Sequence, residues 1–418
     1  VVGSNTPEAH PVISFWLHQA QQRGAALIVI DPRRTDLAEK AELFLQLAPG
    51  TDVALYLGLM HVIVGEGLHD QEFIEERCEG FAELKGILPE YPPARVARIT
   101  GVPEEDIIKA ARLYATSKRA TILYAMGITQ HTFGTENVAS LANLAMLTGN
   151  VGRPSTGIYP LRGQNNVQGA CDMGALPDYL PGYQRAANED VRALFEEKWQ
   201  GPLPQDRGLT VLEMMAGARA GNIRAMYIMG ENPVLSDPDL TETKAALAKL
   251  DFLLVQDIFP TETTQYAHVV LPGVSFAEKG GTFTNTERRI QRIHRAIRPV
   301  GQSLPDWQII GRLATRMGYP MEYSSAEKIM AEIASVTPIY GGVNYDRLGD
   351  GGIQWPCPHQ GHPGTKFLHH ERFAGGKGRL AVVRPQEPAE LPDDDYPLIL
   401  STGRHLYHYH TGTMSRRS

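Results

Sequence analysis

Cysteine is scarce in this chain of 418 residues, which contains only Cys78, Cys171 and Cys357. They lie far apart, so their spacing matches neither iron–sulfur nor zinc ligands and predicts no disulfide framework. Two histidine-rich strings, one of them beside Cys357, are weak zinc candidates because zinc sites of such spacing usually need four ligands. The histidines concerned are His359, His362, His405, His408 and His410. We therefore assign no metal ligand to the chain, and we expect Cys171 to be structural.

The chain also lacks an excess of positive charge, a long apolar run and a secretion signal. Its formal net charge of −7 leaves no basic face for a nucleic-acid partner. The apolar run from Val53 to Gly65 includes His61 and is too short to cross a bilayer, which argues against membrane insertion. We expect a cytoplasmic enzyme, and a periplasmic location stays open because the chain begins within a strand-like run.

The nucleotide-binding fingerprint Gly-x-Gly-x-x-Gly is absent, but a strand–helix–strand pattern occurs twice. The predicted elements run over 1–5, 7–23 and 26–31 in the first copy and over 226–232, 241–250 and 252–257 in the second. A Gly-x-Asn ends the first strand of each copy and an aspartate ends its second strand. These residues are Gly3, Asn5 and Asp31, then Gly230, Asn232 and Asp257. Such units bind nucleotides at the carboxyl ends of their strands, so the repeat predicts two related nucleotide sites facing each other.

The length and a hydrophobic content of 42% predict more than one domain, each with its own core. The pattern predicts an α/β fold with two pseudo-related, Rossmann-like dinucleotide-binding domains, at 1–162 and 163–285, each with a mostly parallel sheet. A smaller mixed helical and loop-rich domain at 286–390 follows, and then the start of a truncated C-terminal β-rich domain at 391–418. Further predicted elements are helices at 101–117, 135–148 and within 303–336, strands at 120–127 and 397–404, loops at 340–379 and a linker at 385–397.

The most distinctive segment is the loop at 161–177, which reads LRGQNNVQGACDMGALP. It has almost no helical or strand periodicity and is rich in glycine, amides and one arginine. Glycine lets the backbone approach a ligand closely, and amides and arginine offer fixed hydrogen-bond donors. The composition is typical of a ligand-binding loop, although ordinary polar loops share much of it.

The string RGQNNVQGACDMGA in this loop resembles the active-site loop of the molybdenum- or tungsten-dependent formate dehydrogenases, and the resemblance extends through nearly the whole chain. The other matching strings are VGSNTPEAHP from Val2, IDPRRTDLAEKA from Ile30, LAMLTGNVGRP from Leu144, MGENPVLSDPD from Met229, VQDIFPTETTQYAHVVLP from Val255, GTFTNTERRIQ from Gly281 and STGRHLYHYHTGTMSRR from Ser401.

The resemblance implies a catalytic subunit that oxidises formate to CO₂ at a molybdenum or tungsten centre held by two molybdopterin guanine dinucleotides. It also implies a 4Fe–4S cluster and a cysteine or selenocysteine metal ligand, both bound upstream of the residues present here. The electrons would pass to iron–sulfur subunits and to flavin- or NAD-linked subunits. Because those upstream ligands and most of the C-terminal domain are missing, we expect a fragment that is inactive by itself.

The same resemblance implies roles for individual residues. Arg162 is expected to be catalytic, because a planar guanidinium grips a carboxylate such as formate with two hydrogen bonds. Gln164 and Asn165 are expected to donate hydrogen bonds to pterin or phosphate. Asp31 and Asp257 are expected to accept hydrogen bonds from guanine N1 and its 2-amino group, which selects guanine over adenine. The other expected cofactor-binding residues are Gly3, Asn5, Arg33, Asp52, Gln130, Gly230, Asn232, Gln256, Thr261, Arg404 and His410.

Two further polar features are interpreted as structural. His131 follows Gln130, and a lone histidine is more often a satisfied polar residue than a proton relay. The arginines from Arg288 to Arg298 are most simply a solvated or ion-paired face, with a phosphate contact by one of them left open.

Two other functions stay open at this point. One is another oxidoreductase of the same superfamily, of the nitrate reductase type, against which the arginine-containing loop argues. The other is a non-catalytic scaffold subunit of a respiratory complex that has lost its cofactor. The paired Gly-x-Asn and aspartate positions argue against such a loss, since a scaffold has no need of them.

Overall fold

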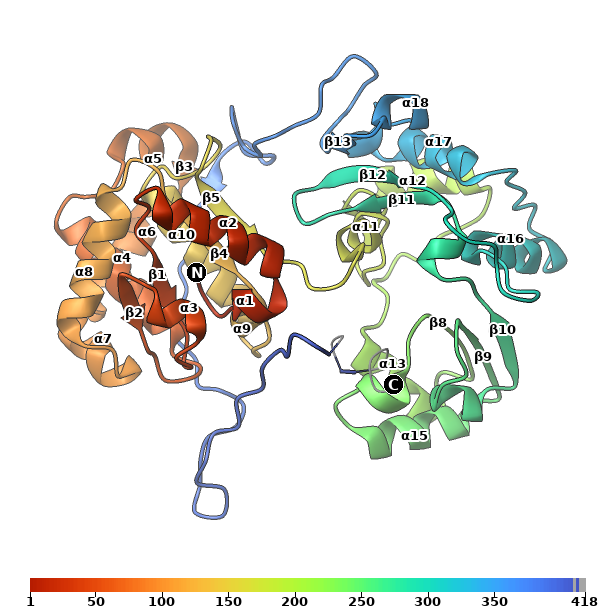
Figure 1. The fold of residues 1–418 in the computed structure, drawn as a ribbon, viewed down its shortest axis with the longest axis horizontal. Coiled ribbons are helices and arrows are strands. Elements are labelled where there is room, and N and C mark those ends of the chain that lie inside the picture. Colours follow the sequence, from red (N-terminus) through yellow and green to blue (C-terminus); the bar gives the residue numbers. More distant parts are fainter. Residues whose placement is uncertain (409–410, 413–418) are drawn as a thin grey trace. The chain divides into compact units, whose positions relative to one another are not determined.

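The structure is a computed structural model that describes residues 1–408 and 411–412, and it divides into two units (Figure 1). Unit 1 consists of Val1–Gly163 and Lys366–Leu406, and unit 2 consists of Gln164–Thr365 with the described residues from Tyr407 onward. The chain thus leaves unit 2 within the segment expected as the third domain, and its strand β14 (Gly378–Arg379) pairs with β3 (Cys78–Glu79) of unit 1. The division into four domains stays a prediction.

Unit 1 contains a parallel sheet built on the N-terminal segment. Its strands are β1 (Ile28–Ile30), β2 (Leu43–Leu45), β4 (Thr121–Tyr124) and β5 (Gly157–Pro160). Val2 bridges Ile30 on one side and Tyr124 on the other, so the order across the sheet is β2-β1-Val2-β4-β5. The chain therefore winds outward in both directions from Val2. In such a doubly wound sheet, ligands bind at the carboxyl ends of the strands where the winding reverses.

The core of unit 1 surrounds α4 (Asp52–Gly65), which is buried over almost its whole length. It packs against α7 (Pro93–Thr100), α8 (Glu104–Thr116) and α10 (Gly134–Leu147). A helix that is apolar all round is stable only when it is covered on every side, as α4 is. The shorter helices of this unit are α1 (Thr6–Ala9), α2 (Pro11–Gln22), α3 (Asp36–Glu39), α5 (Gln71–Arg77), α6 (Phe81–Ile87), η1 (Leu88–Glu90) and α9 (Met126–Thr129).

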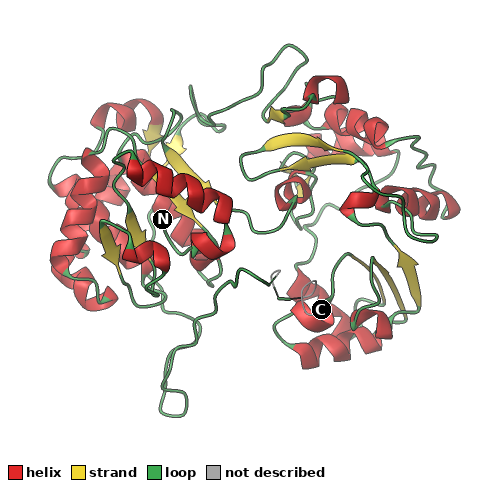
Figure 2. Ribbon diagram, viewed as in Figure 1, coloured by secondary structure: helices red, strands yellow, loops and turns green. Residues whose placement is uncertain are grey.

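Unit 2 contains a second parallel sheet, of order β10-β9-β8 (Figure 1). Figure 2 draws its strands in yellow. Its strands are β8 (Ala225–Met229), β9 (Phe252–Asp257) and β10 (Val269–Pro272), and its helices are α13 (Val211–Ala220), α14 (Pro233–Ser236) and α15 (Leu240–Lys249). The order β10-β9-β8 is that of β2-β1-Val2 in unit 1. The predicted α/β fold with mostly parallel sheets is therefore confirmed.

The rest of unit 2 is a mixed region around an antiparallel sheet of β11 (Gly281–Thr284), β12 (Arg289–Ile293) and β13 (Ile353–Gln354). Its core includes Ile290, Tyr340, Val343 and Cys357. The remaining elements are α11 (Val167–Asp172), β6 (Tyr179–Leu180), β7 (Gln184–Arg185), α12 (Glu189–Trp199), η2 (Thr263–Tyr266), η3 (Phe276–Glu278), α16 (Asp306–Arg316), α17 (Ala326–Val336), η4 (Pro338–Tyr340) and α18 (Tyr345–Leu348). No helix among the described residues is long and apolar enough to cross a membrane.

Three predicted elements differ from the structure. The strand expected at 1–5 is reduced to a bridge at Val2, because Gly3 turns away with φ +53°. The helix expected at 7–23 breaks at His10, because Pro11 disfavours a helical conformation in the residue before it. The strand expected at 397–404 was wrong: Leu398 and Leu400 are 86% and 88% exposed, and no described strand pairs with this segment.

Candidate functional site

The carboxyl edge of the unit 1 sheet brings together segments from distant parts of the sequence. Gly3 follows Val2 directly, and Gly127 lies in α9 after β4. The Gly127 N–H donates to the Gly3 carbonyl at 3.1 Å. A Cβ added to either glycine would lie 2.6–2.7 Å from the backbone of the other. Only two glycines allow the backbones to meet this closely at the point where the winding reverses.

Gly3→Ala is expected to destabilise unit 1 by about 3 kcal/mol or more, because the left-handed backbone disfavours a Cβ and the Gly127 backbone leaves no room for it. Gly230 is the matched control. It has φ +65°, and nothing lies within 4 Å of an added Cβ, so Gly230→Ala should cost only about 1–2 kcal/mol. Urea unfolding of the chain measures both losses. Equal losses at the two positions would show that the Gly3–Gly127 approach is not tight.

Two buried carboxylates follow on the same edge. Asp31 comes directly after β1, is 7% exposed, and accepts a hydrogen bond from the Arg33 backbone N–H at 2.8 Å. Burial raises the pKa of Asp31, and this hydrogen bond offsets part of the rise. Asp52 begins α4 and is 6% exposed, and burial raises its pKa to about 6. The charge of His131 opposes that rise and the charge of Asp31 adds to it, so the two carboxylates and His131 share one environment.

Asp52→Asn is expected to stabilise the cofactor-free chain at neutral pH. The raised pKa means that the folded chain holds this proton more tightly than the unfolded chain, so stability falls as the pH rises through about 6. A pKa raised by roughly two units corresponds to a loss in the free energy of unfolding of at most about 3 kcal/mol at neutral pH. Asparagine, which has no carboxylate to ionise, avoids this loss. Urea unfolding should show the gain at pH 7 and none at about pH 4.

Asp36→Asn is the control for this effect, because Asp36 holds the same first position in α3 but is exposed. It should leave the pH dependence unchanged. If the Asp52→Asn chain were no more stable than its parent at pH 7, the buried Asp52 carboxylate would not destabilise the fold as we infer.

Arg162 lies at the end of β5, on the same edge of the sheet. It is half-buried, and its positive charge partly opposes the rise that burial causes in the pKa of the neighbouring Tyr124. Its carbonyl oxygen accepts a hydrogen bond from His10 Nε2 at 3.0 Å. Arg404 reaches this edge from the returning segment, where its Nη2 lies 2.9 Å from Met126 Sδ and its charge acts on His10. Arg162 and Arg404 thus lie at the same sheet edge as the two carboxylates.

The carboxyl edge of the unit 2 sheet has a similar plan but more internal hydrogen bonds. Asn232 Oδ1 accepts from the Thr263 N–H at 3.2 Å and from its hydroxyl at 2.7 Å, while Nδ2 donates to Glu262 at 2.7 Å. Gln256 accepts from the Tyr227 hydroxyl and donates to Asp306 at 2.7 Å. The amides of Asn232 and Gln256 are therefore used to join elements of unit 2.

The other three residues of this edge lie in or beside turns. Gly230 is exposed, with open space above its Cα, and Asp257 ends β9, where its Oδ1 accepts from the Ile258 N–H at 2.6 Å. Thr261 exchanges hydrogen bonds with Thr264 within one turn. Gly230 and Asp257 follow the strands of this sheet as Gly3 and Asp31 do in unit 1, but Gly230 is open where Gly3 is tightly packed, and Asp257 is half-buried where Asp31 is buried.

The loop that contains the amides is anchored through Asp172, which sequence reasoning missed. This fully buried carboxylate accepts hydrogen bonds from Tyr340 and Trp355 at 2.7 Å each and from Gln168 and Tyr183 at 2.9 Å each. All four donors are neutral, so they satisfy the carboxylate without an ion pair. The loop is thereby tied to segments about 170 residues downstream.

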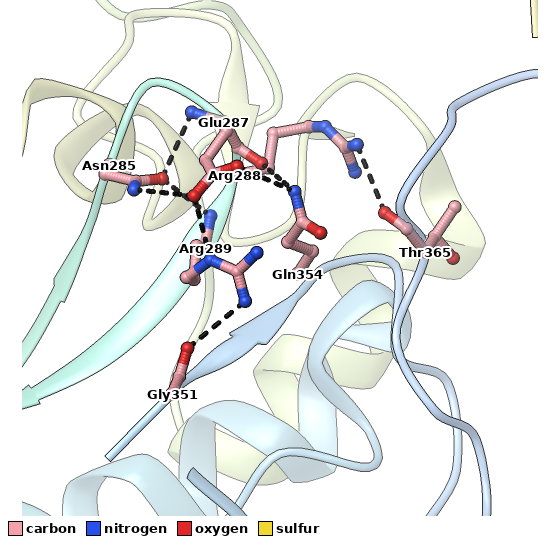
Figure 3. Close-up of polar contacts among 7 residues, drawn as sticks. All are labelled: Asn285, Glu287, Arg288, Arg289, Gly351, Gln354 and Thr365. Carbon is pink, nitrogen blue, oxygen red and sulfur yellow. Dashed lines mark hydrogen bonds and ion pairs between the residues drawn. The ribbon is translucent and has the colours of Figure 1, made fainter. Parts of the chain in front are cut away.

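The arginine-rich strand supports this anchor. Arg288 donates to the carbonyl oxygens of Trp355 and Thr365, and its guanidinium lies 5.3 Å from the Trp355 ring centroid. Arg289 pairs with Glu287 at 2.8 Å and donates a hydrogen bond to the Gly351 carbonyl at 3.1 Å. Figure 3 shows both contacts. The prediction of an ion-paired arginine is thus confirmed for Arg289. Arg288 instead forms hydrogen bonds with the backbone around Trp355.

The structure places the expected site residues in three groups. Gly3, Asn5, Asp31, Arg33, Asp52, Gln130, Arg162 and Arg404 lie at the carboxyl edge in unit 1. Gly230, Asn232, Gln256, Asp257 and Thr261 lie at the carboxyl edge in unit 2. Gln164 and Asn165 precede α11, and His410 lies outside the described residues. Their roles in cofactor binding stay predictions.

The residues missed from the sequence are Gly127, His10 and Asp172. Gly127 had a usable signal, because it follows a strand as Gly3 does. His10 had none, since Arg162 is 152 residues away, and Asp172 lacked one for its two distant donors, Tyr340 and Trp355. Within the described part of the chain, no group of three or more histidine, cysteine or acidic residues could hold a metal ion. Cys357 instead lies 3.4 Å from both Arg347 Nη1 and the His362 carbonyl oxygen.

Comparisons with known proteins agree on one family. The family described as Molybdopterin oxidoreductase matches residues 1–316. The F420-dependent formate dehydrogenase subunit alpha of Methanocaldococcus jannaschii is 52% identical, over 100% of this chain and 62% of that protein. Formate dehydrogenase H of Escherichia coli is 42% identical, over 99% of this chain and 59% of that protein. Among solved structures, the acetylene hydratase from Pelobacter acetylenicus gives a TM-score of 0.69 at 23% identity, over 91% of this chain and 54% of that one.

The chain spans about three fifths of the length of these curated relatives. The sequence matches confirm the resemblance to formate dehydrogenase alpha subunits, and the structural match supports the α/β fold alone. Because the family match includes both parallel sheets and the loop with Arg162, the chain belongs to the molybdopterin oxidoreductase family, which implies a molybdopterin cofactor.

Proposed function

We propose that this chain is part of a formate dehydrogenase catalytic subunit that oxidises formate to CO₂ and releases two electrons and a proton. The observation that carries the proposal is Arg162, at the carboxyl end of β5 and within the string RGQNNVQGACDMGA. The sequence relatives whose names state this activity match over the whole length of that loop.

The role of Arg162 follows from the shape of the substrate. Formate is a carboxylate with a single C–H bond, and a guanidinium holds a carboxylate with two parallel hydrogen bonds. Gripping both oxygens fixes the direction of the C–H bond, which lowers the entropic part of the barrier. The metal centre, when bound, supplies the acceptor for the two electrons of that bond.

The residues present fit two molybdopterin guanine dinucleotides. In unit 1, a glycine with positive φ follows the bridge at Val2, and an aspartate follows β1. In unit 2, a glycine with positive φ follows β8, and an aspartate ends β9. In unit 1, Asn5 Oδ1 is buried and accepts no hydrogen bond from the described residues. Such orphaned acceptors are costly unless a bound group donates to them. Asp31 and Asp257 would accept from guanine, and Gln164 and Asn165 would donate to pterin or phosphate.

Further parts of the proposed enzyme lie outside the described residues. We propose that a 4Fe–4S cluster and the cysteine or selenocysteine metal ligand are supplied by other residues of the longer subunit, with molybdenum or tungsten as the metal. The electrons would pass to iron–sulfur subunits and to flavin- or NAD-linked ones. The relative from Methanocaldococcus jannaschii is named as an alpha subunit, which supports an assembly of this kind.

The direct test of the activity is formate-dependent dye reduction by the metal-loaded enzyme that contains this chain. We expect formate to reduce the dye. We expect no turnover when nitrate replaces the dye as the electron acceptor. Nitrate turnover without formate oxidation would overturn the proposal, and an enzyme devoid of molybdenum, tungsten and pterin would indicate a scaffold subunit.

The guanine assignments have a separate test. Asp31→Asn and Asp257→Asn should each weaken retention of one dinucleotide, because losing a buried charged acceptor costs about 1.5–3 kcal/mol. Pterin and guanine nucleotide content after extended dialysis measures the loss. Asp251→Asn is the control, since Asp251 lies exposed at the opposite end of β9 and pairs with Arg224. Full retention in both test variants would show that these carboxylates do not hold guanine.

A further inference from the structure

We propose that His10 is a positioning residue for Arg162: it holds the peptide group from which the substrate-binding guanidinium projects. The proposal rests on the proposed function of Arg162. His10 Nε2 lies 3.0 Å from the Arg162 carbonyl oxygen, although the two residues are 152 positions apart. His10 belongs to the segment that follows Val2, and Arg162 follows β5. The contact therefore links these two segments at the edge where the winding of the sheet reverses.

The direction of this hydrogen bond is fixed by chemistry. A carbonyl oxygen only accepts, so His10 Nε2 must carry the hydrogen. Burial, the largest cause, and the charge of Arg404 both lower the pKa of His10, although its hydrogen bonds to the backbone oppose them. The neutral ring has one N–H, and this contact fixes it at Nε2. His10 is therefore a donor of fixed position rather than a second positive charge beside Arg162.

The local backbone explains why His10 can reach the carbonyl. His10 lies between α1 and α2 in a non-helical conformation, with φ −143° and ψ 63°, because Pro11 follows it. Its own N–H donates to the Thr6 carbonyl at 2.8 Å, which ends α1 and holds the residue in place. Without the helix break, His10 would be one more side chain along a continuous helix.

The position of Arg162 makes the contact consequential. On one side, the Leu161 N–H donates to the Tyr124 carbonyl at 2.8 Å, which is the last bond tying this strand to β4. On the other side, Gly163 is exposed, and an added Cβ would meet nothing within 4 Å. The Arg162 peptide group is thus held by the sheet before it and by His10 at its own carbonyl. A guanidinium at the end of a long side chain amplifies any rotation of that peptide group.

Two variants of His10 separate positioning from simple packing. Glutamine places an amide nitrogen where the imidazole has Nε2, so His10→Gln keeps the donor. Asparagine places its amide nitrogen near the position of Nδ1, so His10→Asn loses it. In the metal-loaded enzyme we expect His10→Asn to lower kcat/KM for formate about tenfold and to weaken inhibition by azide, since small misplacements of a binding group slow turnover. His10→Gln should stay within about threefold of the parent, and metal and pterin content should be normal in both.

A double-variant cycle with Arg162→Lys completes the test. If His10 acts through Arg162, His10→Asn should have little further effect once the guanidinium is gone. Equal losses in His10→Asn and His10→Gln, or full additivity with Arg162→Lys, would overturn the positioning role. An impaired Arg162→Lys enzyme beside an unimpaired His10→Asn enzyme would overturn only the role of His10. An unimpaired Arg162→Lys enzyme would overturn the proposed function, and the positioning role with it.

Discussion

Arg162→Lys is expected to lower kcat/KM for formate by at least about tenfold in the metal-loaded enzyme, which equals about 1.4 kcal/mol of transition-state stabilisation. Lysine keeps the positive charge but loses the planar fork that grips both carboxylate oxygens. If Arg162 only attracted an anion, the change to lysine would leave kcat/KM for formate almost unchanged. Because geometry is part of the barrier, turnover should fall as well as affinity. Steady-state kinetics with formate and an artificial electron acceptor measures the change.

Two controls define what the loss means. Metal and pterin content should stay near normal, since Arg162 contacts substrate rather than dinucleotide in the proposed function. Arg98→Lys, on the exposed face of α7, should leave the kinetics unchanged. Azide and nitrate, as small anions, should inhibit the parent enzyme and lose potency in Arg162→Lys. Unchanged formate kinetics in that variant would make Arg162 structural and remove the main chemical support for formate as substrate.

Asp172→Asn is expected to destabilise unit 2 by about 2–4 kcal/mol, because a buried amide cannot accept from all four donors that now meet the carboxylate. The asparagine NH₂ group would itself face a donor from Tyr340, Trp355, Gln168 or Tyr183. Urea unfolding of the chain measures the loss.

The matched control for this prediction is Asp178→Asn, six residues further along. Asp178 is exposed, so its change should cost less than about 0.5 kcal/mol. If Asp172→Asn and Asp178→Asn unfolded at the same urea concentration, Asp172 would not anchor the loop. A large loss for Asp172 alone would show that the 164–172 amides are presented by a rigid support.

The local sequence determined the α/β character and the ends of the strands. Gly3, Asn5 and Asp31 follow apolar strands, and the same order recurs at Gly230, Asn232 and Asp257. Because carboxyl ends of parallel strands share one edge, this pattern was enough to place each trio at one edge of a sheet. The string around Arg162 pointed to formate chemistry through its resemblance, since its amides and glycines alone are also those of ordinary loops.

The tertiary structure alone decided which distant residues meet. Periodicity shows which face of an element is apolar, but it does not name the element that covers that face. The Gly3–Gly127 approach, the His10–Arg162 hydrogen bond and the hydrogen bonds from Tyr340 and Trp355 to Asp172 all join segments that lie more than 100 residues apart. The same limit explains the strand expected at 397–404, whose apolar residues suit a sheet but have no partner strand among the described residues. A strand exists only when a neighbour takes up its backbone hydrogen bonds, and that neighbour is chosen by the packing of the whole fold.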